Sequence, residues 1–275
     1  MLAQNLTFIG GGNMARSLIG GLIANGFAAN QIRVVDPNEA QRQQLAHMGV
    51  AVYETASAAL FETELLVLAV KPQIMADVAK SLAAEVQRTK PLVISVAAGI
   101  RCDDLARWLG GNVAIVRTMP NTPALVQSGA TGLYANAKVT TAQKNQAESL
   151  MRSVGISLWV NDEALIDSVT ALSGSGPAYY FLMMEAMMKA GEDLGLDAKA
   201  ARLLTVQTAL GAAKMAIESA ATPAELRAQV TSPNGTTEAA IKHFQQHDYE
   251  GLVLSAMQAA QARAQVLAQA LGAQA

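Results

Sequence analysis

The sequence is poor in the side chains that bind metals or act as nucleophiles. Its 275 residues include one cysteine, Cys102, and three histidines. A single cysteine excludes an internal disulfide and a thiolate metal cluster, and it suits a reducing compartment. His243 and His247 have a spacing that can bind zinc, but no third ligand accompanies them in the sequence. We therefore expect no metal site, and no Ser-His-Asp or Cys-His arrangement can be assembled.

The sequence also lacks an excess of either charge and any long apolar run. Twenty Lys and Arg against 22 Asp and Glu give a net charge of −2, which argues against binding to nucleic acid or anionic lipid. Residues 1–5 contain no basic segment that leads into an apolar stretch, and the apolar runs at 65–70 and 92–100 are too short to span a bilayer. We expect a cytoplasmic protein with a small-molecule partner, no nucleic acid and no membrane contact.

A glycine-rich turn lies where the first predicted strand meets the first predicted helix. The spacing Gly10-x-Gly12-x-x-Ala15 follows the apolar run at 6–9 and opens a helical pattern at 13–24. It provides a tight turn, a bare backbone and a small residue for packing helix on strand. The helix N-terminus then offers N–H groups and a positive dipole end to an anion. The turn indicates a dinucleotide pyrophosphate site, and the alternative is a tight turn with no ligand.

Short apolar runs alternate with helical patterns through the first part of the chain, and helical periodicity alone continues from Glu163. The alternation is typical of right-handed βαβ units and a mostly parallel sheet. We predict an α/β Rossmann-type domain at 1–161 and an all-α domain at 162–275. The predicted strands are 6–9, 32–35, 65–69, 92–95 and 113–116, with edge strands at 132–135 and 156–160 and a helix at 141–153 between them.

Three loops that follow predicted strands contain small residues, at 69–72, 96–99 and 119–123. They should face the cofactor, because ligands bind beyond the carboxyl ends of the strands in such a sheet. Lys71 either reaches a phosphate or ribose oxygen or is an ordinary surface lysine. Asp36 ends the second strand, where a carboxylate would bind the ribose hydroxyls and repel a 2′-phosphate, so this rule alone favours NAD(H).

The helical part contains two turns of small and polar residues. The segment 230–237, Val-Thr-Ser-Pro-Asn-Gly-Thr-Thr, precedes a helical pattern at 238–247. Its N-terminal N–H groups suit a substrate carboxylate, although a plain N-capped loop would look the same. The segment 173–179 opens a second helix and either packs near the first turn or simply places Pro177 near the helix start.

The helix pattern at 181–188 is apolar on more than one face and rich in methionine. Either a partner subunit covers it, or it is a central core helix filled with adaptable Met side chains.

These motifs together resemble pyrroline-5-carboxylate reductase. The resemblance rests on 230–237, on Gly-Ser-Gly-Pro-Ala-Tyr at 174–179, Met-Pro-Asn-Thr-Pro at 119–123, Ala-Val-Lys-Pro at 69–72 and Gly-Gly-Gly-Asn-Met-Ala at 10–15. It is collinear over nearly the whole chain, and the first motif is far more specific than a Rossmann fingerprint.

The resemblance implies reduction of 1-pyrroline-5-carboxylate to L-proline by NADPH or NADH. It implies an N-terminal dinucleotide domain and a helical domain that builds a homodimer, often assembled into a homodecamer. Thr237 would be the catalytic residue, near the ring nitrogen. The expected substrate-binding residues are Glu163, Ser175, Val230, Ser232, Asn234, Gly235, Thr236 and Thr237. The expected cofactor-binding residues are Ile9, Gly10, Gly11, Gly12, Asn13, Met14, Asp36, Ala69, Val70, Lys71, Pro72, Val96, Ala97, Ala98, Met119, Pro120 and Asn121.

Three positions depart from the family pattern. Many members carry Ser where this chain has Asp36, Asn where it has Ala56, and Gly where it has Asn234. The first two put the cofactor preference in doubt, whereas Asn tolerates the positive φ of the third position.

Two other functions compete with this interpretation. A β-hydroxyacid dehydrogenase would carry a lysine and, four residues later, an asparagine on the helix after a glycine-rich turn, but this chain has Lys189 and then Asp193. A non-catalytic NAD(P)H sensor would bind the cofactor without turnover.

Overall fold

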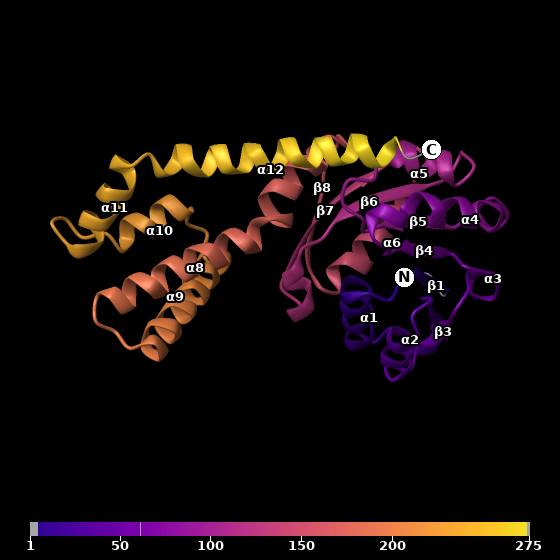
Figure 1. Ribbon diagram of the computed structural model, residues 1–275, viewed down its shortest axis with the longest axis horizontal. Helices are drawn as coiled ribbons and strands as arrows, with labels where there is room; N and C mark the ends of the chain where they lie inside the picture. The colour runs from indigo at the N-terminus through magenta and orange to yellow at the C-terminus, as the bar shows by residue number, and fades with distance from the viewer. Residues whose placement is uncertain (1–4, 61, 274–275) are drawn as a thin grey trace. The chain divides into compact units, whose positions relative to one another are not determined.

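The computed structural model describes residues 5–60 and 62–273, which form two compact units (Figure 1). The first unit contains the described residues up to Ser175 together with 260–273, and the second contains Gly176–Ala259. Residues 1–4, which entered the expectation about targeting segments, lie outside the described residues. Within the described ranges, no helix has both the length and the apolar character needed to cross a membrane.

An eight-stranded sheet is the centre of the first unit in the described part of the chain. Its strand order is β3-β2-β1-β4-β5-β6-β7-β8, and only the β6–β7 pair is antiparallel. The chain order reverses beside β1, which lies between β2 and β4, and such a switch point opens a crevice at the carboxyl ends of the strands. The strands are β1 (Leu6–Ile9), β2 (Ile32–Val35), β3 (Ala51–Tyr53), β4 (Leu65–Leu68), β5 (Leu92–Ser95), β6 (Ile115–Met119), β7 (Gly129–Ala135) and β8 (Gly155–Trp159).

Helices cover both faces of this sheet, so the central strands are apolar on both sides. One core contains Phe8 and Val67 with residues of α1 and α6, and the other contains Leu66 and Val93 with residues of α4 and α5. The helices of this unit are α1 (Asn13–Ala24), α2 (Glu39–Ala46), α3 (Ala56–Ala59), α4 (Met75–Thr89), α5 (Cys102–Trp108), α6 (Thr141–Arg152) and α7 (Leu165–Val169).

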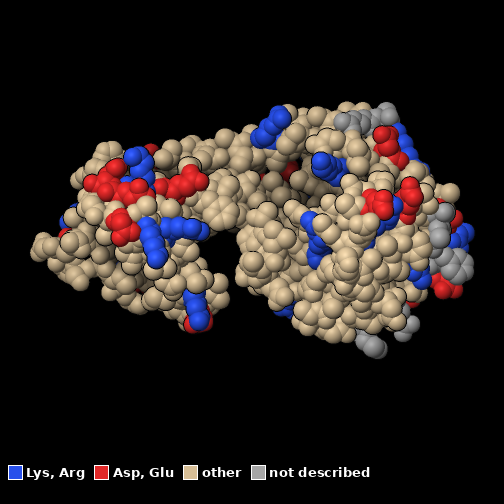
Figure 2. Space-filling view, turned by 60° about the horizontal axis from the view of Figure 1, so that its bottom comes forward, with Lys and Arg blue, Asp and Glu red and all other residues tan. Residues whose placement is uncertain are grey.

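The second unit is entirely helical, and α8 and α9 pack side by side in it (Figure 1). Side chains around α8 are widely exposed, including Phe181 at 58%. Figure 2 shows acidic and basic side chains gathered on the visible face of this unit, at the left, with areas of other residues around them. The prediction that a partner subunit covers α8 accounts for this apolar exposure better than a central core position does. The helices are α8 (Gly176–Asp193), α9 (Ala198–Glu218), α10 (Pro223–Gln229), α11 (Thr236–Gln246) and α12 (Tyr249–Gly272), of which the last ends in the first unit.

The predicted fold class is confirmed: a mostly parallel Rossmann-type sheet is followed by a helical region. Three details of the strand prediction were wrong. The strand predicted at 113–116 lies at Ile115–Met119, and the strand predicted at the edge of the sheet at 132–135 is β7, which lies between β6 and β8. The strand β3 was not predicted because a three-residue edge strand leaves little apolar signal. The compact units divide at Ser175, later than the predicted boundary at 161. The reason is that α7 packs on β7, where a Cβ on Gly132 would lie 2.7 Å from Cγ1 of Val169.

Candidate functional site

The glycine-rich turn occupies the carboxyl end of β1, beside the switch point of the sheet. Gly10 has a φ of +97°, and a Cβ there would lie 2.7 Å from the carbonyl oxygen of Ala69. A Cβ on Gly11 would lie 3.3 Å from Oδ2 of Asp36. Gly12 is the N-cap of α1, and no described protein atom lies within 4 Å of the position of its Cβ. Protein packing therefore accounts for the first two glycines, and Gly12 leaves room for a ligand at the helix N-terminus.

Asp36 follows β2 and its carboxylate is held against this turn. Oδ2 accepts a hydrogen bond from the Gly11 amide at 2.8 Å, and Oδ1 accepts one from the Asn38 amide at 2.8 Å. Nη1 of Arg42 donates to the carbonyl oxygens of Asp36 and Pro37, each at 2.8 Å. The carboxylate therefore has a fixed position between the ends of β1 and β2, where a ribose bound across the turn would lie.

The other predicted cofactor loops lie along the same edge, because β4, β5 and β6 are parallel to β1. Lys71 is exposed and precedes a short 3₁₀ turn. Asn121 is buried, with Oδ1 accepting from the Ala130 amide at 2.9 Å and Nδ2 donating to the Ser173 carbonyl at 3.0 Å. Its side chain joins β7 to the π-helical segment, and its carbonyl accepts from the Ala124 amide at 3.2 Å, which leaves only its backbone N–H for a ligand.

Ser175 follows a π-helical segment, not the open turn that the sequence suggested. Residues Thr170–Gly174 form this segment, and the Ser175 amide donates to the Thr170 carbonyl at 2.8 Å. Pro177 has no N–H to donate to the carbonyl four residues before it, that of Ser173, and this is the carbonyl that Asn121 binds. Bulges of this kind occur often at functional sites.

Glu163 takes part in a buried ion cluster on the same unit. Its Oε1 lies 3.2 Å from Nη1 of Arg117 and accepts a hydrogen bond from the Cys102 amide at 2.8 Å. Arg117 is only 2% exposed, and its Nη2 also lies 3.6 Å from Oδ1 of Asp167. Burial, and next the charge of Glu163, raise the pKa of the Cys102 thiol well above its ordinary range. The sequence interpretation missed Arg117, although a charge at the end of an apolar strand was a usable signal.

The predicted substrate loop lies in the second unit, between α10 and α11. Val230 is the C-cap of α10, and Gly235 is the N-cap of α11. The Gly235 amide donates to the Ser232 carbonyl at 3.0 Å, and Asn234 adopts a φ of +60°. Thr236 and Thr237 form the exposed first turn of α11, where, among the described residues, no side chain caps the helix. This loop therefore presents the N–H groups of a helix start to solvent.

Glu238 stabilises the shape of this loop. Its Oε2 accepts a hydrogen bond from the Asn234 amide at 2.9 Å, and its Oε1 lies 3.1 Å from Nζ of Lys242. The Asn234 hydrogen bond, and then Lys242, hold the pKa of this carboxyl below its usual range.

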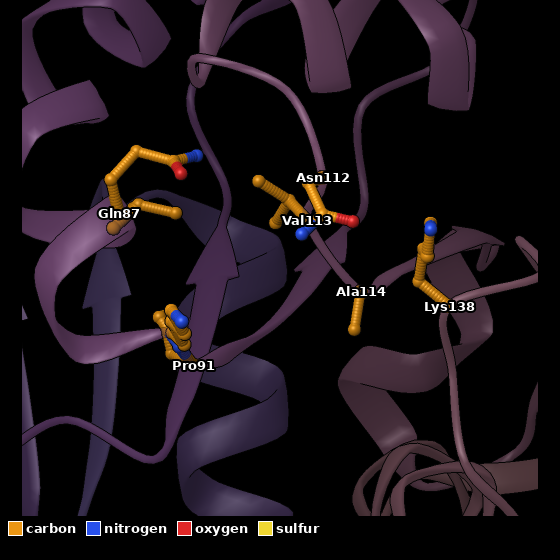
Figure 3. Close-up of a pocket in the computed structure, with 8 residues that line it drawn as sticks. Gln87, Pro91, Asn112, Val113, Ala114 and Lys138 are labelled. Atoms are coloured by element: carbon orange, nitrogen blue, oxygen red, sulfur yellow. The ribbon is translucent and has the colours of Figure 1, made fainter.

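A separate cavity of about 230 Å³ lies at the opposite edge of the sheet (Figure 3). Gln87, Asn112 and Lys138 line it near the amino ends of β5 and β6. The amide of Gln87 is already bonded to the carbonyls of Leu109 and Gly111, at 2.8 and 2.7 Å. This cavity therefore lies at the amino ends of the strands, whereas the glycine-rich turn lies at their carboxyl ends.

Two residue pairs that the sequence analysis considered, His243 with His247 and Lys189 with Asp193, contact each other within a single helix or at its end. Nδ1 of His247 lies 2.8 Å from the carbonyl oxygen of His243, and no group of three potential metal-ligating side chains was found within the described ranges. Lys189 forms an exposed ion pair with Asp193 at 3.4 Å.

Comparison with known proteins assigns both regions of the chain. Residues 163–267 match the family model for pyrroline-5-carboxylate reductase dimerisation, and residues 5–99 match that for NADP oxidoreductase, coenzyme F420-dependent. The chain is 54% identical to pyrroline-5-carboxylate reductase of Pseudomonas aeruginosa, over 99% of this chain and 100% of that protein.

Two solved structures are similar over almost their full length. That of a pyrroline-5-carboxylate reductase from Coxiella burnetii has a TM-score of 0.93 at 47% identity, covering 96% of this chain and 98% of that one. That of the Plasmodium falciparum enzyme, with NADP bound, has a TM-score of 0.85 at 26% identity, covering 98% and 99%.

Proposed function

The chain belongs to the pyrroline-5-carboxylate reductase family, and we propose that it reduces 1-pyrroline-5-carboxylate to L-proline with NAD(P)H, the last step of proline biosynthesis. The observation that carries this proposal is the 54% identity to a curated reductase over the full length of both chains. The glycine-rich turn supplies independent support, since Gly12 leaves room for a phosphate at the start of α1.

The dinucleotide would bind across the carboxyl edge of the sheet. The amides of Gly10 and Gly11 donate to the Val35 carbonyl and the Asp36 carboxylate, each at 2.8 Å, and so shape the turn. The backbone N–H groups of Gly12, Asn13 and Met14 would hold the pyrophosphate, and Asp36 would bind the adenosine ribose. The loops after β4, β5 and β6 would hold the other half of the cofactor against backbone and small side chains. A bound NAD(P)H supplies a hydride, which is the only redox chemistry that the reaction needs.

The proposed substrate-binding residues are those of the loop at 230–237 in the second unit and, in the first unit, Glu163 and Ser175. The first-turn N–H groups of α11 would hold the carboxylate, and the Thr237 hydroxyl would form one hydrogen bond at the ring nitrogen. When the carbon of the protonated imine accepts the hydride with its electron pair, the C=N π electrons would move to nitrogen, which already carries its proton and would become a neutral amine. Orientation alone can supply roughly 7 to 11 kcal/mol of barrier reduction, so this chain needs neither a nucleophile nor a metal.

The assembly follows from the helical region. The family's dimerisation model covers residues 163–267, so the protein is a homo-oligomer, and we propose a homodimer that closes into a homodecamer. We further propose that residues 1–161 form the dinucleotide domain and that 162–275 form the dimerisation and substrate domain. The proposed location of the protein is the cytoplasm. Light scattering at micromolar concentration should give a mass above the 28.7 kDa of one chain. A monomer alone would contradict the proposed assembly.

The activity is tested by following NAD(P)H absorbance with purified protein. Oxidation should require 1-pyrroline-5-carboxylate and should produce proline in equal amount. Tight NAD(P)H binding without any turnover would favour the sensor instead, and turnover of a β-hydroxyacid would favour the dehydrogenase.

A further inference from the structure

The end of α12 packs directly on the loop that follows β5. Gly99 in this loop has a φ of +74°, and a Cβ there would lie 3.1 Å from Cδ1 of Leu271 and 3.7 Å from the Ala268 amide nitrogen. Leu271 is 8% exposed and belongs to the same core as Ala97 and Ile100. The contact between loop and helix is therefore as close as a glycine allows.

Polar contacts join α12 to two other elements, one at its end and one near its middle. Nη2 of Arg107, on α5, donates to the Gly272 carbonyl at 2.7 Å and lies 3.0 Å from Oδ1 of Asp104. A cation at this position complements the negative end of the helix dipole. Nε2 of Gln261, near the middle of α12, donates to Oγ of Ser168 at 2.7 Å, which joins α12 to α7.

The loop itself has few backbone hydrogen bonds. The Val96 amide donates to the Leu68 carbonyl at 3.1 Å, and the Ala97 amide donates to Oγ of Ser95 at 3.3 Å. A turn follows at Ala98–Gly99, and among the described residues the amides of Ala98, Gly99 and Arg101 have no hydrogen-bond partner. Packing rather than hydrogen bonding therefore positions the second half of the loop, and α12 provides that packing.

The position of the loop in the sheet relates it to the cofactor. Asp36 and β2 lie on one side of β1, and β4 and β5 lie on the other. A dinucleotide with its pyrophosphate at the β1 turn and its adenosine at Asp36 must extend toward β5 with its nicotinamide half.

We propose that the end of α12, residues 264–272, is a brace that holds the loop at 96–99 in the conformation that binds the nicotinamide half of the cofactor. Leu271 is then a positioning residue that acts through Gly99. This inference rests on the proposed function. The dimerisation model that matches this chain ends at residue 267, before both Ala268 and Leu271.

The test compares Leu271→Ala with Val266→Ala, which removes apolar atoms from a 51% exposed position on the same helix. NADPH and NADH are each titrated into the full-length protein and followed by nicotinamide fluorescence. If the loop at 96–99 adopts its cofactor-binding conformation about one tenth of the time once the brace is removed, the Kd for NADPH and NADH should rise roughly tenfold in Leu271→Ala. Val266→Ala should bind as the wild type does, and the KM for 1-pyrroline-5-carboxylate should stay unchanged in both variants.

Arg107→Gln weakens the contact between α5 and the end of α12 without opening a cavity. This variant tests the proposed brace if Leu271→Ala fails to fold. It should raise the cofactor Kd by about two- to fivefold. Wild-type Kd values in both Arg107→Gln and folded Leu271→Ala, with only a lower Tm, would overturn the brace. A wild-type protein that binds NADPH but never turns over 1-pyrroline-5-carboxylate would contradict the proposed activity and leave the Kd comparison intact.

Discussion

Replacing Asp36 with serine should move the cofactor preference toward NADPH. The carboxylate is held beside the glycine-rich turn by the amides of Gly11 and Asn38, so it cannot turn away without breaking both hydrogen bonds. At about 5 Å, Coulomb's law gives a repulsion per unit charge of about 0.8 kcal/mol in bulk water and about 3 kcal/mol at an effective dielectric constant of 20. Asp36 is half-buried, so a cost of about 1 to 3 kcal/mol applies, or roughly 5- to 150-fold in affinity.

The assay is the ratio of kcat/KM with NADPH to kcat/KM with NADH, at a fixed concentration of 1-pyrroline-5-carboxylate. We expect Asp36→Ser to raise this ratio by at least about tenfold, or about 1.4 kcal/mol. The guanidinium of Arg42 donates to the carbonyls of Asp36 and Pro37, and we expect it to partner a 2′-phosphate once the carboxylate is gone.

Asp36→Asn is the matched control, since its single side-chain oxygen can still accept from the Gly11 amide while the charge and the hydrogen bond from the Asn38 amide are removed. A similar rise in both variants attributes the preference to charge, and a rise in Asp36→Ser alone attributes it to the shape of the turn. An unchanged ratio in Asp36→Ser would mean that the carboxylate does not face the ribose, and the placement of the cofactor at the end of β2 would be wrong.

Three further predictions follow from other parts of the chain. Thr237→Ala should lower kcat/KM roughly 10- to 100-fold, or about 1.4 to 2.7 kcal/mol, at nearly unchanged NAD(P)H affinity; a normal kcat/KM with poor folding would mean that the residue only shapes its helix. Arg117→Met should lower the free energy of unfolding in denaturant by about 3 to 5 kcal/mol, because Glu163 then lacks its buried partner. The same substitution at the exposed Arg88 should change the free energy of unfolding by less than about 1 kcal/mol. Equal effects of the two substitutions would refute the role of the cluster. The raised pKa of the Cys102 thiol contributes stability that is complete below the ordinary thiol pKa of 9.0 and is lost as the pH rises above it. The fall in Tm between pH 8 and 10 should therefore be smaller in Cys102→Ala than in the wild type. An equal fall in the two proteins would contradict this.

The elements that the sequence predicted well are those whose signal is local. The run Leu65–Leu68 is fully buried because helices cover both faces of the sheet, and continuous apolar residues are the expected pattern for such a strand. The glycine-rich turn was predictable for a similar reason, since the φ of Gly10 and the contact with Ala69 leave no room for a side chain. The edge strand β3 has neither signal and was missed.

Sequence alone thus determined most of the buried strands, the glycine-rich turn, the helical second half and the family resemblance, because each depends on residues within a few positions of one another or on whole motifs. The tertiary structure alone decided which distant side chains meet. Arg117 pairs with Glu163 across 46 positions, Asn121 binds the carbonyl of Ser173, and Leu271 packs on Gly99. No periodicity or turn chemistry encodes such pairs, since they form only when a particular helix packs on a particular strand and the two charges or surfaces are buried together.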